Sequence, residues 1–206
     1  MTMGKKLLGY AAGLGLGCAL ASGANAAIFT ESGDASNLLS GAQVVGSGIN
    51  QINGSIDLND LGDLYRVTFA TGGTLTINGN ITGGFIDPVA FLFVASGAGI
   101  AFNVDCGGPN STITVNIAAG TYYVGIGDFP MRAFDLDGTT WNSVTVPADF
   151  GTLASIQNIG TINRGSYSIL LSIETGTASV PEPMTLGLLG AGLAGLGVAA
   201  RRRRRA

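Results

Sequence analysis

The chain has 206 residues, of which 13 are acidic and 10 are basic, and it contains no histidine. Seven of the basic residues lie at the two ends, so residues 27–179 hold three arginines against twelve acids, a net charge of −9. This charge would repel nucleic acid and anionic lipid, and the absence of histidine excludes Ser-His-Asp and Cys-His nucleophile systems.

The N-terminal segment has the pattern of a cleavable signal peptide. Two lysines precede an uncharged apolar run, Leu7–Ala21, which at about 15 residues is shorter than the roughly 20 that a bilayer core requires. Small residues follow at Ala24 and Ala26, as a signal peptidase requires. We therefore predict a signal peptide at 1–26, cleaved after Ala26, rather than an uncleaved membrane anchor.

The two cysteines leave an alternative open. Leu16-Gly17-Cys18 loosely resembles a lipoprotein signal, in which Cys18 would be acylated and become the new N-terminus. If the whole signal is removed instead, Cys106 is the single remaining cysteine, so no disulfide can form within the mature chain. Cys106 would then be either a buried apolar residue or a thiol that pairs between molecules.

Residues 27–174 are predicted to form one all-β body. Apolar and polar residues alternate in several short runs, and 89–94 is apolar on both sides, as in a strand that is covered on both faces. Residues 113–126 are predicted to form a β-hairpin that turns at Ala119-Gly120. Turn residues separate the runs at spacings typical of an antiparallel sandwich. The alternating runs are 64–69, 74–77, 112–117 and 167–173.

Four segments within about 57–127 share a further pattern. They are Asp63-Leu64-Tyr65-Arg66-Val67, Gly73-Thr74-Leu75-Thr76-Ile77, Asp87-Pro88-Val89-Ala90-Phe91-Leu92-Phe93 and the run from Ile113 to Val124. Together they resemble the bacterial pre-peptidase C-terminal family. The resemblance implies an antiparallel, jelly-roll-like β-sandwich that serves as an accessory binding or stabilising module. Relatives commonly carry paired acids after the central strand, where this chain has only Asp105.

Three aspartates are candidates for a calcium site or for catalysis. Asp135 and Asp137 would lie on one face if their segment were extended, and a pair of carboxylates can serve a glycosidase. Asp135-Leu136-Asp137-Gly138 is also typical of a solvated turn, or of half a calcium loop that lacks its other ligands. Asp105 completes the calcium candidates. We nevertheless expect a non-enzymatic protein that has no metal or other cofactor.

Aromatic residues in the glycine-rich stretch 127–149 are candidates for carbohydrate contact. Trp141, Phe134 and Phe129 lie there in a segment without clear periodicity. Aromatic rings on the loops of a sandwich can stack on sugar rings. The alternative is that the same rings pack the loop onto the sandwich.

The C-terminal region combines a linker, a proline motif and a short apolar helix. Residues 175–179 are Gly, Thr, Ser and Ala, and the following motif is Val180-Pro181-Glu182-Pro183, in which two prolines favour an extended backbone. Met184–Ala200 is an uncharged run of 17 residues that predicts a membrane-spanning helix. The cluster Arg201, Arg202, Arg203, Arg204 and Arg205 would stay cytoplasmic and hold the body outside.

This tail, residues 180–206, resembles the PEP-CTERM sorting signal. The resemblance implies an exported protein of a Gram-negative bacterium that is processed by an exosortase, an integral membrane enzyme, and is associated with the cell surface or an extracellular matrix that contains exopolysaccharide. We therefore expect a surface or matrix protein with exosortase and, through its body, exopolysaccharide as partners. The alternatives are an unprocessed, membrane-anchored adhesion protein and a carboxylate-dependent, glycosidase-like hydrolase.

Overall fold

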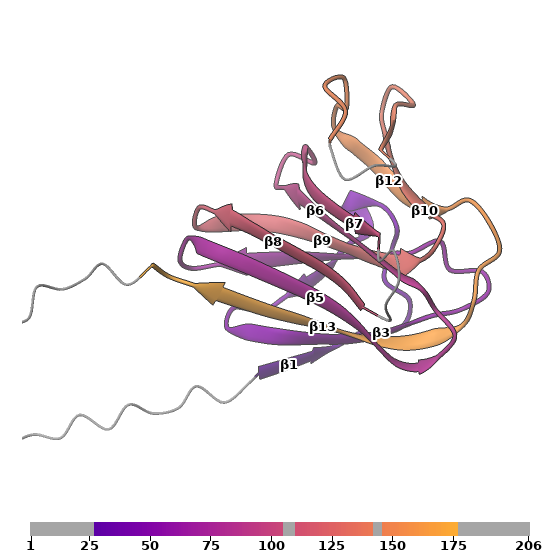
Figure 1. The fold of residues 1–206 in the computed structure, drawn as a ribbon, viewed down its shortest axis with the longest axis horizontal. Helices are drawn as coiled ribbons and strands as arrows, with labels where there is room; N and C mark the ends of the chain where they lie inside the picture. The colour runs from indigo at the N-terminus through magenta and orange to yellow at the C-terminus, as the bar shows by residue number, and fades with distance from the viewer. Residues whose placement is uncertain (1–26, 105–109, 142–145, 177–206) are drawn as a thin grey trace, which may run out of the picture.

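The computed structural model describes residues 27–104, 110–141 and 146–176 (Figure 1). The predicted signal peptide, sorting motif, transmembrane helix and arginine cluster lie outside the described residues, as do Asp105 and Cys106. No helix in the described part is long and apolar enough to cross a membrane.

Strands make up 62% of the described residues and helix 2%, so the all-β prediction is confirmed. The elements are β1 (Ala27–Thr30), the 3-10 helix η1 (Leu39–Gly41), β2 (Gln43–Val45), β3 (Ile49–Ile56), β4 (Asp63–Phe69), β5 (Gly73–Gly84), β6 (Pro88–Val94), β7 (Gly99–Val104), β8 (Asn110–Ile117), β9 (Gly120–Asp128), β10 (Met131–Asp135), β11 (Thr140–Trp141), β12 (Leu153–Asn158) and β13 (Gly165–Glu174).

Two five-stranded sheets pack face to face, and a smaller sheet lies against one of them. Sheet 1 has the order β1-β3-β13-β5-β8, sheet 2 the order β2-β4-β9-β6-β7, and sheet 3 the order β11-β10-β12. The last strand, β13, lies at the centre of sheet 1, where it pairs with β3 and β5. The start of β1 and the end of β13 lie at the same end of the sandwich (Figure 1).

The prediction of antiparallel strands throughout is wrong at two sheet edges. β1 pairs with β3 in parallel, and β2 pairs with β4 in parallel. The first four strands alternate between sheet 1 and sheet 2. A chain that crosses to the other sheet and returns runs in its original direction, so the strands of each pair are parallel.

The predicted hairpin at 113–126 is also wrong, although both of its strands exist. β8 pairs with β5 in sheet 1, whereas β9 pairs with β4 and β6 in sheet 2. The link at Ala118 and Ala119 therefore carries the chain from one sheet to the other. Period-two alternation identifies a strand, but it does not show whether the next turn keeps the chain in the same sheet.

The main core lies between sheets 1 and 2. Each strand of sheet 1 sends alternate aliphatic side chains into it, and these meet side chains from sheet 2. Phe29 of β1 packs edge-on against Tyr65 of β4, with ring centroids 6.1 Å apart. Fully buried members of this core include Ile52, Leu75, Ile77, Tyr65, Leu92, Val124 and Ile169.

A second core explains why 89–94 is apolar on both sides. The outer face of sheet 2 is covered by sheet 3 and the chain near it, and β6 is buried along almost its full length. Phe91 and Phe93 pack there edge-on against Trp141, each with a centroid distance of 5.7 Å. The prediction that this strand is covered on both faces is thus confirmed.

Candidate functional site

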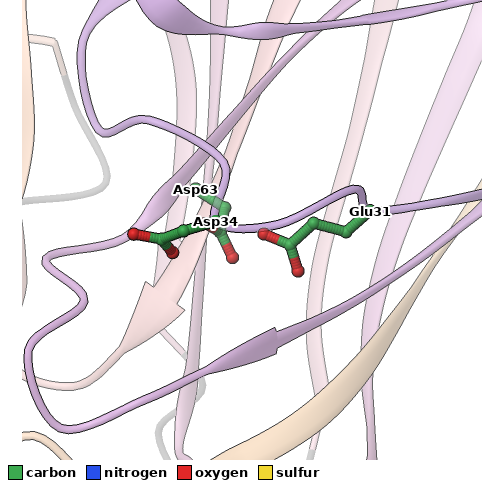
Figure 2. Close-up of side chains that lie close together, drawn as sticks. All are labelled: Glu31, Asp34 and Asp63. Carbon is green, nitrogen blue, oxygen red and sulfur yellow. The ribbon is translucent and has the colours of Figure 1, made fainter.

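Three carboxylates from two separate parts of the chain meet at one end of the sandwich. Glu31 directly follows β1, Asp34 lies in the next turn, and Asp63 is the first residue of β4. One carboxylate oxygen from each lies within 4.8 Å of the other two. Figure 2 shows the three side chains gathered at this point, with Glu31 reaching in from the opposite side to Asp34.

The position of Glu31 is fixed by hydrogen bonds to backbone N–H groups. Its Oε1 accepts from the N–H of Ala35 at 2.7 Å, and its Oε2 accepts from the N–H of Ser55 on β3 at 2.9 Å. Gly33 has a φ of +72°, a left-handed conformation that favours glycine and turns the chain between Glu31 and Asp34.

Asp60 adds a fourth carboxylate from the loop that leads into β4. Its side chain is 5% exposed, and its Oδ1 accepts from the N–H of Gly62 at 2.8 Å. Gly62 has a φ of +127°, and a side chain there would collide with Met131, so this tight turn requires glycine. Asp60 lies near enough to Asp63 for its charge to raise the pKa of Asp63.

A chain of hydroxyl groups connects Asp63 to the interior. The Tyr167 hydroxyl donates to Asp63 Oδ2 at 2.5 Å, and the Tyr65 hydroxyl lies 2.6 Å from that of Tyr167. Asp63 and both tyrosines are fully buried. The other oxygen, Asp63 Oδ1, has no hydrogen-bond partner, and neither has Asp60 Oδ2. A buried carboxylate oxygen without a partner costs free energy, so this part of the site needs a positive ligand or a proton.

The pKa values of the cluster also show that these carboxylates lack positive partners and hydrogen-bond donors. Burial, together with the neighbouring charges of Asp60 and Glu31, raises the pKa of Asp63 to about 9. Burial raises the pKa of Asp60 to about 7, and it also raises the pKa of Glu31. Each group is disfavoured as an anion because it is poorly solvated and faces other acids.

A hard divalent cation suits this set of donors. Calcium binds carboxylate and carbonyl oxygens in flexible geometry, whereas zinc and copper prefer nitrogen or sulfur ligands. A hollow of about 260 Å³ beside the cluster offers an entry path from solvent; it is lined by Gly33, Asp34, Ser55, Asp57, Asn59 and Asp60. Glu31, Asp34 and Asp63 are therefore the residues whose oxygens lie close enough together to hold one metal ion, and Asp60 is a further buried acid beside them.

The calcium candidates named from the sequence do not form this site. Asp135 lies in a turn, where its carboxylate accepts from the N–H groups of Asp137, Thr139 and Gly151 at 3.0, 2.6 and 2.7 Å. These bonds lower the pKa of Asp135, whereas a general acid needs a raised pKa. Asp137 lies in the same turn with an exposed side chain, and Asp105 lies outside the described residues. Of the interpretations made from the sequence, the turn fits the geometry of Asp135 and Asp137, but Asp137 alone is solvated and Asp135 is buried.

The three candidate aromatic residues have different environments. Trp141 is 0% exposed and packs among Phe91, Phe93 and Phe102, so it is not available for carbohydrate contact, and the alternative that this ring packs the segment onto the sandwich holds. The segment is less irregular than predicted, because it contains β10 and β11, and these strands direct the ring into the second core. Phe134 is half-buried, and Phe129 is 47% exposed. Carbohydrate contact by Phe129 stays a prediction.

The acidic cluster itself was missed in the sequence, although a signal was present. Asp57, Asp60 and Asp63 recur at intervals of three just before a strand. Acids that are concentrated around a turn with glycine at Gly62 can indicate a cation loop. The contribution of Glu31 and Asp34 was not visible in this way, because it depends on the pairing of β1 with β3.

The described residues thus define an all-β sandwich module with an oxygen-lined candidate cation site. Beyond them, residues 179–205 match the PEP-CTERM protein-sorting motif, so this chain carries a PEP-CTERM sorting signal and the predicted resemblance is confirmed. The motif indicates an exported protein of a Gram-negative bacterium that is targeted to an exosortase.

Comparison of the body with solved structures gives a β-sandwich neighbour. It is similar to the pre-peptidase C-terminal domain of collagenase from Bacillus anthracis, known from a 1.0 Å crystal structure. The TM-score is 0.40 and the sequence identity 18%, over 64% of this chain and 94% of that chain. A search of curated proteins found no match.

Proposed function

We propose that the protein is a non-enzymatic component of the cell surface or extracellular matrix, whose sandwich body is stabilised by calcium at Glu31, Asp34 and Asp63, beside the buried Asp60. An exosortase processes its tail, and the mature protein associates with exopolysaccharide. For the body, the supporting observation is the buried Asp63 carboxylate, whose Oδ1 has no partner within a cluster of acids.

The proposed precursor is held at the membrane by its two ends. The signal peptide is removed after Ala26, and the C-terminal helix keeps the chain in the membrane until the exosortase acts near the proline motif. The segments of this precursor are the signal peptide 1–26, the body 27–174, the linker 175–179, the motif 180–183, the transmembrane helix 184–200 and the cytoplasmic cluster 201–205.

We expect the cation site to lie far from Glu174, where the body leads into the linker. β13 ends at Glu174, next to the linker, whereas its first residues lie beside the hollow and the acids. A strand of ten residues spans about 30 Å. The proposed calcium site would therefore lie at the distal end of a body tethered through Glu174. In this position calcium neutralises the buried acids and ties β1 to the loop before β4, and it has no catalytic step.

The sorting proposal is tested by the intact mass of the mature chain. We would purify the protein from the envelope and from the culture medium of its own host and measure both forms. A form that begins at Ala27 and ends near Pro183 is the expected result. A membrane form that retains Arg201–Arg205 would instead identify the tail as a permanent anchor, favour the adhesion alternative and overturn processing by an exosortase.

A further inference from the structure

The outer face of sheet 1 is built from uncharged polar side chains. Each strand of this sheet alternates, so that aliphatic residues enter the core and the intervening residues face outward. Pairing across the sheet aligns the outward residues into rows. One row is Thr30, Asn53, Ser168, Asn80 and Asn110, and the next is Ile28, Gln51, Leu170, Asn78 and Thr112.

The same chemistry continues along the longer strands. The third row is Ser172, Thr76 and Thr114, and the fourth is Glu174, Thr74 and Asn116. In these four rows of the described strands, Glu174 is the one charged residue. Neighbouring hydroxyl and amide groups bond to one another, as in Thr74 Oγ1 to Asn116 Oδ1 at 2.8 Å and Gln51 Nε2 to Asn53 Oδ1 at 2.7 Å.

This neutrality contrasts with the rest of the body. Residues 27–179 carry a net charge of −9, yet the four rows of the described strands contain a single acid, Glu174, and Glu31 is the acid that lines the hollow beside them. An anionic polymer gains no basic contact on this face, and a cationic one gains almost no acid. The surface is therefore complementary in charge to an uncharged ligand.

A hollow of about 480 Å³ lies at one end of the neutral face. It is lined by side chains from four strands, including Thr30, Gln51, Asn53, Thr82 and Ser166, and it borders Glu31 of the cation cluster. Hydroxyl and amide groups both donate and accept hydrogen bonds. A concave site lined by such groups suits a ligand that is rich in hydroxyls.

The apolar residues of this face are few and well placed for a sugar. Ile28 and Leu170 pair on either side of Gln51 and are 53% and 43% exposed. A stable protein interface needs a larger apolar centre with buried anchors. Two aliphatic side chains next to hydroxyl and amide groups match a sugar ring instead, which has an apolar C–H face and a rim of hydroxyls.

We propose that the hollow and the adjoining rows of sheet 1 bind an uncharged polysaccharide chain. This inference rests on the proposed association with exopolysaccharide and specifies its site and class of ligand. The polysaccharide would contact Gln51, Asn53 and Thr82 in the hollow and extend from there along the neutral rows.

The test uses the mature exported chain, purified from its host with calcium present, in affinity electrophoresis through gels that contain a soluble polysaccharide. The probes are dextran, a soluble mixed-linkage β-glucan and galactomannan as neutral polymers, and polygalacturonate as the acidic one. We expect retardation by at least one neutral polymer and none by polygalacturonate.

Variants locate the site. The double change Gln51→Ala with Asn53→Ala should weaken neutral binding at least about tenfold, because two amide groups are lost. Thr82→Val keeps the strand-forming shape, removes one hydroxyl and should weaken binding about threefold even if the double variant folds poorly. Thr68→Val removes one hydroxyl from an exposed residue of β4 in sheet 2, outside the neutral face, so it is the matched control and should bind normally.

Three results would overturn this inference. They are retention by polygalacturonate alone, binding that the hollow variants leave intact, and binding to none of the three neutral polymers. Each would leave the processing of the tail untouched, because that is measured independently by the mass of the mature chain. A mature chain that keeps its tail but binds a neutral glucan through the hollow would overturn the processing of the tail and support the binding inference.

Discussion

Asp63 and Asp135 are both buried, at 0% and 3% exposure, yet their surroundings are opposite. The carboxylate of Asp135 accepts three backbone N–H groups, and its pKa is lowered. Asp63 accepts one tyrosine hydroxyl and keeps Oδ1 without a partner, and its pKa rises to about 9. The fold satisfies one anion internally and leaves the other for a proton or a cation.

The contrast between Asp63 and Asp135 shows that the burial of an acid is a poor indicator of function unless its hydrogen bonds are also considered. Asp128 belongs with Asp135, since it is 1% exposed but accepts from Asp87 and Asn163. Such acids hold loops in place. The Asp63 cluster has carboxylates in excess of donors, and this excess is what distinguishes a candidate ligand site from a structural turn.

The largest effect is expected from Asp63→Asn. Calcium at 100 times its dissociation constant stabilises a one-site protein by about 2.7 kcal/mol, or about 5–10 °C for a domain of this size. The variant should lose this gain, with calcium affinity lower by at least about 100-fold. Calorimetric titration and thermal unfolding of the full chain, with and without chelator, measure both quantities.

Asp149→Asn is the matched control for this prediction, because Asp149 is exposed and lies outside the cluster. It should keep the full response to calcium. An Asp63→Asn chain that still gains the same melting temperature on addition of calcium would show that the ion binds elsewhere.

Lowering the pH should also weaken calcium binding in the wild-type chain, by an amount that depends on how far the pH falls. The pKa values of about 7 and 9 for Asp60 and Asp63 mean that calcium displaces one proton between these values and two below about 7. Affinity should therefore fall about tenfold per unit from pH 9 to 7 and up to about 100-fold per unit below pH 7.

The metal-free protein should show the opposite trend in this range. Raised pKa values contribute stability that is complete below the unfolded values, near 4, and is lost as the pH rises through about 7 and about 9. Chelator-treated protein should thus unfold more easily at pH 9 than at pH 6. A calcium affinity that is the same at pH 6 and pH 9 would contradict proton release from the cluster.

The sequence predicted much of the fold, because alternation at 64–69, 112–117 and 167–173 records which side chains enter the core. It did not predict the partners of the strands. The link at Ala118-Ala119 resembles a hairpin turn, but it carries the chain from one sheet to the other. The strands β1 and β3 are parallel because β2, which lies between them in the sequence, belongs to the other sheet.

The candidate site was less predictable for the same reason. Asp135 and Asp137 are two residues apart, so the sequence alone indicates them as a pair. Glu31 and Asp63 are distant in the sequence and are brought together by pairing of β1 with β3 and by packing of the two sheets. Trp141 was misassigned because β10 and β11 lack a clear alternating pattern, although they turn this ring inward. Non-local contacts, rather than local composition, decide these positions.

The smallest effect is expected from Asp135→Asn, which tests whether the Asp135 carboxylate only stabilises its turn. The amide keeps one oxygen acceptor but presents an N–H₂ group where a carboxylate oxygen now accepts from a backbone N–H. We expect the free energy of unfolding to fall, since a charge-assisted bond is lost. Because the lowered pKa of Asp135 gives stability that disappears as the pH falls below about 4, the variant should approach wild-type stability in acid.

The calcium affinity of Asp135→Asn should not differ from that of the wild-type chain. Denaturant unfolding at pH 7 and pH 3, paired with a calcium titration, measures all three quantities, and a loss of calcium binding in Asp135→Asn would erase the distinction between the two aspartates.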